Sequence, residues 1–598
     1  RAILSGPAGG VSAAAYHGQL LGESKVIAFD MGGTSTDISL IEDGVPHIAH
    51  EKFEGGWKIA VPMIDIHTMG AGGGSIASVG PGGILHVGPQ SAGADPGPAC
   101  YAKGGEDATV TDANLMLGYL DADNFLGGKA KLNKVLAEKA LEERVAKPLG
   151  MTIVEAAYGV SRVVATTMAE GIRLMSVQRG VDPREFAILA FGGAAGLHAS
   201  QVARELQVDK VHLPAAGPVL SAYGMLCTDL KYDFSRSYPA SLDGITLETV
   251  RSILSGLETQ GREKLRAQGI AEVDIEVQRS ADMRYLDQVY EVNVAVPDPS
   301  LHDDVFLSEW SGNFHQRYQE LFSYHQQDQE VRLVTLRATV VGRLSRISQP
   351  QDTRTHDAAV APSPVTTRRV YLGEWYEVPV YSIDRLPPGL GLDGPAILES
   401  DFTTILVEAG DRVTVDQAGG IELHVALEDS QTALSSVRGE LVEPCAGDDS
   451  AARPDPITLA VVEHRLESIA LEMTEVMLRT AMSQILNSSR DFSTAILDGE
   501  CQLVAQGEGI PVHISALPIA GAAVREYFGE DMSEGDLFVL NDPYFGGSHL
   551  PDITIIRPVF YQGELLFYGV NRAHHSDVGG GTHGGYNPRA TEIYQEGI

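Results

Sequence analysis

Long hydrophobic runs are absent from this chain. No segment reaches the roughly 18 consecutive apolar residues that a membrane-spanning helix requires. Residues 1–20 contain Ser, Gly, Pro and His where a secretory signal needs an unbroken apolar core. We therefore expect neither a membrane span nor a membrane partner.

Positive charge and cysteine are both scarce. Lys and Arg number 44 against 80 Asp and Glu, a formal net charge of −36 at pH 7. Because such a surface repels phosphate, a nucleic-acid partner is not expected. The four cysteines are far apart and form no C-x-x-C pair. We therefore expect them to be free thiols in a reducing, cytoplasmic compartment. They are Cys100, Cys227, Cys445 and Cys501.

The length of 598 residues suffices for about three to five domains. Residues 426–455 are polar and rich in turn-forming residues, which is typical of a connector. A helical pattern follows, with Pro456 near its start and apolar residues recurring from Leu459 to Leu478. We interpret that stripe as a helix packed in a core.

Residues 26–40 (VIAFDMGGTSTDISL) combine an apolar strand, a Gly-Gly turn and an alternating strand. Glycines let backbone N–H groups approach a phosphate, and the flanking acids are placed to reach a phosphate-bound magnesium ion. An ordinary hairpin would explain the turn but not the acids and threonines around it. The predicted phosphate and magnesium residues are Asp30, Gly32, Gly33, Thr34 and Asp37.

Two further glycine clusters occupy residues 68–76 (TMGAGGGSI) and 191–198 (FGGAAGLH), the second after the apolar strand 186–190. A strand, a glycine turn and a small-residue helix start allow a helix N-terminus to face an anion. With a helical segment over 153–179 between them, the clusters predict one nucleotide site built from several loops. The predicted contacts are Gly72, Gly73, Gly74, Gly192, Gly193 and His198, with a structural cap as the alternative for His198.

A cluster near the end of the chain has metal-ligating chemistry. It consists of His549-Leu-Pro-Asp552, the run His574-His575-Ser-Asp577, and Asp491. Two imidazoles and two carboxylates suit zinc or manganese. H-x-x-D is a short pattern, so polar loop residues satisfied by hydrogen bonds are the alternative.

Five motifs together resemble the A component of the hydantoinase/5-oxoprolinase family, which has the actin-like ATPase fold of sugar kinases and heat-shock chaperones. The motifs are DMGGTSTD (30–37), MGAGGGSI (69–76), GADPGPACY (93–101), TVTDAN (109–114) and FGGAAGLH (191–198). The resemblance covers residues 1–425 and implies an α/β protein that binds ATP and Mg²⁺. It places an actin-like (ribonuclease H-like) core at 1–230, a β-rich region at 231–425 and a linker at 426–455.

Residues 456–598 resemble the start of the family's B component, an α+β metal-binding domain. The shared motifs are RDFS (490–493), IPVHI (510–514), NDPYFGGSHLPDI (541–553), RAHHSDVGG (572–580) and TEIYQEG (591–597). The resemblance assigns one divalent transition metal to Asp491, His549, Asp552 and His574. Hydrogen bonds to these ligands are the expected roles of His513, His575 and Asp577, and a solvated loop is favoured over substrate contact for His583.

An ATP site and a metal site suit the opening of a cyclic amide, because resonance makes such amides resistant to water. Phosphorylation of the amide oxygen removes that resonance, and a zinc-type ion lowers the pKa of water to about 7. We therefore predict an ATP-dependent amidohydrolase of the 5-oxoprolinase or hydantoinase type. Its predicted catalytic residues are Asp30, Asp491 and His574.

Two other functions stay open. An ATP-dependent carboxylase of the acetone or acetophenone type is built from similar parts, and none of the motifs separates it from the hydrolase. A non-catalytic actin-like nucleotide-binding module, or a kinase of a small metabolite, would leave the metal cluster without a role. The motifs also do not specify which cyclic amide is bound. A homo-oligomer or an A/B-type multimer is the default expectation for the family.

The chain departs from the family pattern in one respect. An actin-like ATPase uses two phosphate hairpins, and only the one at Asp30 is found here. The chain also begins with Arg and ends at Ile598 without a closing element. We therefore expect a piece of a longer protein that lacks the first lobe and the end of the B component.

Overall fold

The chain divides into two compact units. The computed structural model describes residues 5–49, 52–54, 57–59, 63–286, 288, 291–322, 325–344, 362–427, 455–481, 483–487, 489–507, 509–582 and 587–597. Unit 1 comprises Arg1–Met225, Gln349–Leu478 and Ser483–Ile598, and unit 2 comprises Leu226–Ser348 and Arg479–Met482. Most of the predicted connector, 428–454, lies outside the described residues.

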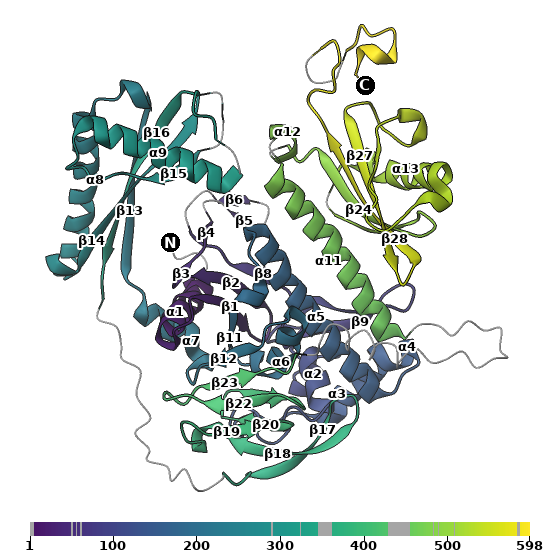
Figure 1. The fold of residues 1–598 in the computed structure, drawn as a ribbon. Coiled ribbons are helices and arrows are strands. Elements are labelled where there is room, and N and C mark those ends of the chain that lie inside the picture. Colours follow the sequence, from purple (N-terminus) through teal and green to yellow (C-terminus); the bar gives the residue numbers. More distant parts are fainter. Residues whose placement is uncertain are drawn as a thin grey trace. The chain divides into compact units, whose positions relative to one another are not determined.

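A nine-stranded sheet forms the centre of unit 1 (Figure 1). Its main order is β19-β22-β23-β12-β11-β1-β2-β3, and β8 pairs with β2. β1 is parallel to β11 and antiparallel to β2, and β11 is parallel to β12. The strands are β1 (Lys25–Met31), β2 (Thr36–Glu42), β3 (Val45–Pro46), β8 (His67–Met69), β11 (Ala187–Phe191), β12 (Lys210–Leu213), β19 (Gly391–Asp393), β22 (Arg412–Val415) and β23 (Ile421–His424).

Helices cover both faces of this sheet because its strands are apolar on both sides. Along β1, Val26 and Ala28 pack in one cluster with α1 (Ser5–Leu21). Ile27 and Phe29 point the other way, into the core with α5 (Ile153–Arg179) and α6 (Ala195–Leu206). The period of two in a strand thus sets which helix each residue meets.

The long helix α5 agrees with the predicted helical segment. Thr152 and Glu155 form a capping box at its start, and Gly180 ends it in a left-handed conformation. Smaller elements complete this part of unit 1. They are β4 (Ile48–Ala49), β5 (Lys52–Glu54), β6 (Trp57–Ile59), β7 (Met63–Ile64), β9 (Ser75–Val79), β10 (Leu85–Ser91), α2 (Val110–Met116), α3 (Lys134–Leu141), α4 (Lys147–Leu149), α7 (Leu220–Cys227), β17 (Thr366–Tyr371), β18 (Trp375–Ser382), β20 (Ala396–Glu399) and β21 (Thr404–Val407).

Unit 2 is a four-stranded antiparallel sheet with two helices packed on one face. The strand order is β13-β16-β14-β15, and both helices share one apolar cluster with the sheet. The region predicted to be β-rich therefore also contains two long helices. The elements are β13 (Leu230–Ser241), α8 (Leu247–Arg266), β14 (Ile275–Tyr285), β15 (Val292–Ala295), α9 (Asp303–Phe322) and β16 (Val331–Gly342).

The last part of unit 1 is an antiparallel sheet of order β25-β24-β28-β27-β26. The predicted helix after the connector is confirmed as α11, whose Ala470 packs with Ile496 of β24. α13 packs against the sheet through a separate cluster. The elements are α11 (Pro456–Thr480), α12 (Gln484–Asn487), β24 (Phe492–Asp498), β25 (Leu503–Gln506), α13 (Pro511–Phe528), β26 (Phe538–Leu540), β27 (Asp552–Tyr561) and β28 (Glu564–His574).

The predicted α/β class is confirmed by these mixed sheets and their covering helices. Among the described helices, none combines the length and apolar character that crossing a bilayer demands.

Candidate functional sites

The glycine turn between β1 and β2 presents open amides. Gly33 and Thr34 are exposed at its tip, and their N–H groups have no hydrogen-bond acceptor among the described residues. Asp30 and Asp37 face each other across the two strands. Thr68 donates a hydrogen bond of 2.6 Å to Asp37. Two free amides beside two carboxylates fit a phosphate with its magnesium ion.

The second glycine cluster supports this turn from behind. The amides of Gly73 and Gly74 donate to the carbonyls of Gly32 and Gly33, at 3.1 and 2.6 Å, and the Gly72 amide donates to Ser75 Oγ at 2.8 Å. A Cβ on Gly72 would lie 2.6 Å from the Ser35 nitrogen. The three amides thus donate to acceptors within the protein. These glycines therefore support the β1–β2 turn and do not present free N–H groups to a phosphate.

Asp30 is the most perturbed carboxylate at this turn. Burial raises its pKa to about 6, a hydrogen bond from Ser221 opposes the rise, and the charge of Asp37 adds to it. Ser221 Oγ lies 3.2 Å from Asp30 Oδ2. No sequence pattern pointed to Ser221, because its approach to Asp30 depends on the packing of α7 against α1.

The third glycine cluster begins α6 next to Asp30. A Cβ on Gly192 would lie 2.5 Å from Asp30 Oδ1, so this segment reaches the same site. His198, which was predicted to contact the nucleotide, is fully buried, and its Nε2 lies 3.3 Å from Asn114 Nδ2. Burial lowers the pKa of His198 to about 4. The structure therefore places His198 in the core, and its predicted contact with a nucleoside stays a prediction.

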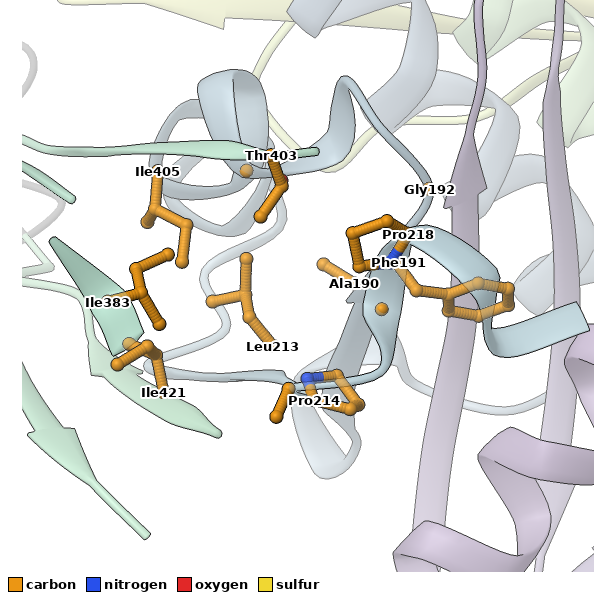
Figure 2. A pocket seen from close by; sticks show the side chains of 13 residues that line it. Ala190, Phe191, Gly192, Leu213, Pro214, Pro218, Ile383, Thr403, Ile405 and Ile421 are labelled. Atoms are coloured by element: carbon orange, nitrogen blue, oxygen red, sulfur yellow. The ribbon is translucent and has the colours of Figure 1, made fainter. Parts of the chain in front are cut away.

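A pocket lies at the carboxyl ends of β11 and β12, where ligands commonly bind to open α/β sheets. Its wall is apolar, with Leu213, Pro214, Ile383, Ile405 and Ile421 pointing into the space shown in Figure 2. Thr403 carries the one polar side chain of the lining. Gly192 is also part of the lining, so the pocket adjoins the glycine turn that approaches Asp30.

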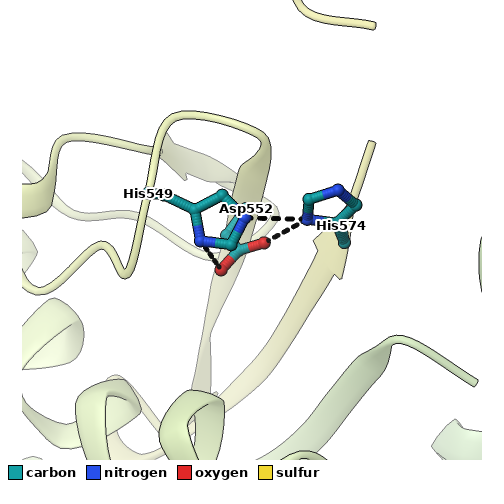
Figure 3. Close-up of side chains that lie close together, drawn as sticks. All are labelled: His549, Asp552 and His574. Atoms are coloured by element: carbon teal, nitrogen blue, oxygen red, sulfur yellow. Dashed lines mark hydrogen bonds and ion pairs between the residues drawn. The ribbon is translucent and has the colours of Figure 1, made fainter. Parts of the chain in front are cut away.

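Three of the four predicted metal ligands meet at one point (Figure 3). Strand pairing sets Asp552, at the start of β27, opposite His574, at the end of β28. His574 Nδ1 lies 3.0 Å from Asp552 Oδ1 and 2.9 Å from His549 Nε2. His549 Nδ1 lies 3.1 Å from Asp552 Oδ2. One donor atom from each residue can be chosen so that all lie within 4.8 Å of one another.

The donor set fits a divalent ion. Burial alone would raise the pKa of Asp552, but hydrogen bonds from His513, Ser548 and His574 hold it well below its usual value. Burial lowers the pKa of His549, which keeps that imidazole neutral and able to ligate. Asp552 Oδ2 is buried without a well-directed hydrogen bond, so it has lone pairs to offer. Zinc and manganese both accept nitrogen and oxygen donors of this kind.

Asp491 and His513 border this cluster. The Asp491 carbonyl accepts a hydrogen bond from the His574 amide at 3.0 Å. Its carboxylate lies 3.9 Å from His513 Nε2, which is 3.2 Å from Asp552 Oδ2. The predicted fourth ligand is thus adjacent to the group without forming part of it. His575 donates its amide to Pro551, Asp577 accepts from the Gly579 amide, and His583 lies outside the described residues.

Arg572 is a buried cation that the sequence patterns did not single out. It is 0% exposed, and its guanidinium donates to Thr554 Oγ1 at 2.8 Å and to Ser548 Oγ at 3.3 Å. It also donates to the carbonyls of Gly546 and His513. Arg572 therefore ties the loop that carries His549 to the strand that carries His574.

Three family models match nearly the whole chain. Residues 1–234 match the model described as hydantoinase/oxoprolinase. Residues 243–425 match the hydantoinase/oxoprolinase C-terminal domain, and residues 455–598 match hydantoinase B/oxoprolinase. The resemblance predicted from the motifs is confirmed by these matches.

Individual relatives cover the chain to different extents. 5-Oxoprolinase 1 of Arabidopsis thaliana is 33% identical over 622 residues, which are 100% of this chain and 47% of that protein. The crystal structure of the ATP-dependent caprolactamase from Pseudomonas jessenii has a TM-score of 0.61 at 39% identity, over 70% of this chain and 61% of its own. A nucleotide-free acetone carboxylase structure has a TM-score of 0.63 at 26% identity, over 71% and 62%. This chain thus spans about half to three-fifths of the length of the proteins it matches.

Proposed function

The chain belongs to the hydantoinase/oxoprolinase family, and from that premise we propose that it takes part in ATP-dependent hydrolysis of a cyclic amide, such as 5-oxoproline, a hydantoin or a lactam. One observation carries this proposal. A single chain holds a turn with two open amides beside Asp30 and a convergent cluster of two imidazoles and a carboxylate. Each arrangement suits one half of the reaction.

The proposed nucleotide site is built on an actin-like, ribonuclease H-like core. The strand order β3-β2-β1-β11-β12, with β2 antiparallel to β1, supports this assignment. The Gly33 and Thr34 amides bind phosphate oxygens, and Asp30 and Asp37 hold the magnesium ion or its waters. Gly72 to Gly74 support the turn so that its amides keep a fixed direction, which favours charge stabilisation in phosphoryl transfer.

The proposed metal site consists of His549, Asp552 and His574, and Asp491, which borders this group without joining it, would have to turn toward a bound ion to become the predicted fourth ligand. A zinc ion bound there would lower the pKa of its water to about 7, and either zinc or manganese would polarise a carbonyl. His513 and Arg572 hold Asp552 and the His549 loop in place. The carboxylate of Asp491, which is partly exposed, is the acceptor that we propose for a proton of the attacking water.

The two sites divide the chemistry. The γ-phosphoryl group of ATP passes to the amide oxygen, which releases ADP and removes the amide resonance. Water then adds to the activated carbon, the C–N bond breaks and the ring nitrogen takes a proton. A second water converts the remaining acyl phosphate into the carboxylate and inorganic phosphate. One ATP and two waters are consumed for each ring opened.

The test is to measure ADP and amino-acid product with ATP, Mg²⁺ and zinc, using 5-oxoproline, hydantoin and caprolactam as substrates. Asp30→Asn should abolish ADP formation. His549→Ala should lower the bound metal and the ring-opened product while nucleotide binding persists. The matched controls are Asp43→Asn, at an exposed position in the turn after β2, and His424→Ala, at a partly exposed position on β23.

A second candidate is an ATP-dependent carboxylase, which the structural likeness to acetone carboxylase favours. There the phosphoryl group would activate bicarbonate and an enol in place of an amide. ADP release that requires acetone or acetophenone together with bicarbonate, with no ring opening of any cyclic amide, would replace the hydrolase proposal by this one.

A further inference from the structure

One residue of the motif TVTDAN (109–114) lies behind the glycine turn between β1 and β2 (residues 32–35), here called the phosphate turn. Thr111 is 7% exposed, and its hydroxyl donates a hydrogen bond of 2.7 Å to the carbonyl of Gly73. We propose that Thr111 is a positioning residue that aims the Thr34 amide at a phosphate. The inference rests on the proposed function, because it requires that a nucleotide binds at the phosphate turn.

Planar peptide groups pass the direction of one hydrogen bond on to the next. A trans peptide group is flat, so its C=O and its N–H point in opposite directions. The Gly33 carbonyl and the Thr34 amide belong to one such group. Because the Gly33 carbonyl accepts from the Gly74 amide at 2.6 Å, the Thr34 N–H points away from Gly74, toward the exposed tip of the turn. The bond on the far side of the peptide group therefore sets the direction of the open amide.

Thr111 holds the next peptide group in this series. The Gly73 carbonyl shares a peptide group with the Gly74 amide. It uses both of its lone pairs, because the amide and the hydroxyl of Thr111 each donate to it at 2.7 Å. With the carbonyl held in this way, the Gly74 N–H points in the opposite direction, at Gly33. Thr111 is thus connected to the Thr34 amide through two peptide groups.

A parallel series orients the Gly33 amide and ends in a backbone group. The Ser75 amide donates to the Gly72 carbonyl at 3.0 Å. In the next peptide group, the Gly73 amide donates to the Gly32 carbonyl at 3.1 Å, which leaves the Gly33 N–H pointing outward. The first series ends at a side-chain hydroxyl instead, so a substitution can remove that hydrogen bond and leave the backbone unchanged.

Burial and close packing make the series that ends at Thr111 rigid. Gly73, Gly74 and Thr111 are all buried, and successive hydrogen bonds polarise one another in a low dielectric. A Cβ on Gly73 would lie 2.9 Å from Thr111 Oγ1, and a Cβ on Gly74 would lie 2.8 Å from the Gly33 carbonyl oxygen. The loss of the Thr111 hydroxyl is therefore expected to alter the direction of the Thr34 amide.

The start of α2 fixes the position of Thr111. Thr109 and Asp112 form a capping box at this end of the helix, and Asp112 also accepts from the Cys100 amide at 2.7 Å. Amides in the first turn of a helix have no acceptor within the helix, so the Thr111 amide is free to donate to Gly73. Residues of two sequence motifs thus hold the support of the phosphate turn in place.

The test is calorimetric titration of the full chain with ATP and with inorganic tripolyphosphate, in the presence of Mg²⁺. Thr111→Val keeps the shape of the side chain and removes the hydroxyl, so it should weaken both ligands about tenfold. Thr111→Ser keeps the donor and should restore most of both affinities. The matched control is Thr474→Val, because Thr474 is 4% exposed and its hydroxyl also donates to a backbone carbonyl, that of Ala470 at 3.1 Å.

The outcomes separate this inference from the proposed function. If the unmodified chain binds ATP and Thr111→Val binds it equally well, the positioning role is overturned and the ATPase proposal stands. If Thr111→Ser or Thr474→Val is as weak as Thr111→Val, the loss reflects a general effect on stability, which also overturns the positioning role. If the unmodified chain binds neither ATP nor tripolyphosphate, both proposals fail.

Discussion

His198 illustrates how burial fixes the charge of a single residue. Burial lowers its pKa in the folded chain to about 4, below the ordinary value of 6.5, so protons bind preferentially to the unfolded chain between these values. The stabilisation from neutral His198 is complete above pH 6.5 and is lost as the pH falls toward 4. At pH 5 we expect the free energy of unfolding to be about 2 kcal/mol lower than it is above pH 6.5.

Hydrogen-exchange mass spectrometry of peptides from β11 and α6 measures this effect. Protection in the unmodified chain should fall more steeply from pH 7.5 to pH 5 than in His198→Gln, after correction for intrinsic exchange. His302→Gln, at an exposed site in unit 2, should behave like the unmodified chain. An equal fall in His198→Gln would show that other groups govern the acid sensitivity.

Arg572 should determine how tightly the metal cluster binds its ion. Arg572→Met removes hydrogen bonds to Ser548, Thr554 and two backbone carbonyls, which frees the loop that carries His549. We expect zinc affinity to fall by about tenfold to hundredfold, as when groups that orient metal ligands are removed. Competition with a chromophoric chelator gives the affinity.

Two further variants make that result interpretable. Arg557→Met alters an exposed arginine on the neighbouring strand β27 and should leave zinc binding unchanged. Arg572→Lys keeps the charge but cannot reach every acceptor at once, so it should give an intermediate affinity. Unchanged affinity in a folded Arg572→Met chain would remove Arg572 from the metal site.

Residue spacing predicted part of the site and could not predict the rest. The H-x-x-D motif and the paired ends of β27 and β28 bring His549, Asp552 and His574 together. Arg572 and Ser221 were not predicted as site residues, because the sequence around a single arginine or serine does not show which residues will pack against it. Their roles arise from tertiary contacts, which local patterns do not encode.

At the scale of elements, the close approach of α1 and α7 positions the phosphate turn. A Cβ on Gly224 of α7 would lie 1.8 Å from the Gly9 carbonyl of α1. Gly224→Ala should therefore force the helices apart, cost about 2 kcal/mol of unfolding free energy and draw Ser221 away from Asp30. Gly6→Ala, where a Cβ meets nothing within 4 Å, is the matched control.

Circular dichroism on heating measures this cost, and ATP titration measures the effect on Asp30. Gly224→Ala should melt at a lower temperature and bind ATP more weakly, while Gly6→Ala should match the unmodified chain. An equal melting temperature for the two variants would mean that the helices can separate without strain.

Periodicity predicted several elements well, because their signals are local. The β1–β2 hairpin, α5 and the start of α11 agree with the alternation, caps and helical spacing in the sequence. The partner of β12 was not foreseeable in this way. β23, from residues more than 200 positions later, pairs with β12 and joins the same sheet, and local patterns hold no information on such long-range pairing.

At the scale of the whole molecule, unit 2 has a hydrophobic core of its own. Phe306, Trp310 and Phe314 of α9 are fully buried against Met283 and Leu336 of its sheet. A contiguous chain with its own core can fold alone. We therefore expect a fragment of residues 226–344 to fold and to unfold cooperatively.

Urea unfolding of this fragment, followed by the fluorescence of Trp310, should give a single transition with a slope of about 1–3 kcal/mol/M. The same transition should be present in the full chain beside that of unit 1. Trp310→Phe removes the fluorescence signal but keeps most of the apolar volume, so its transition, followed by circular dichroism, should persist with a modest loss of stability. A fragment that shows a gradual, uncooperative change in urea would mean that unit 2 needs the rest of the chain for its stability.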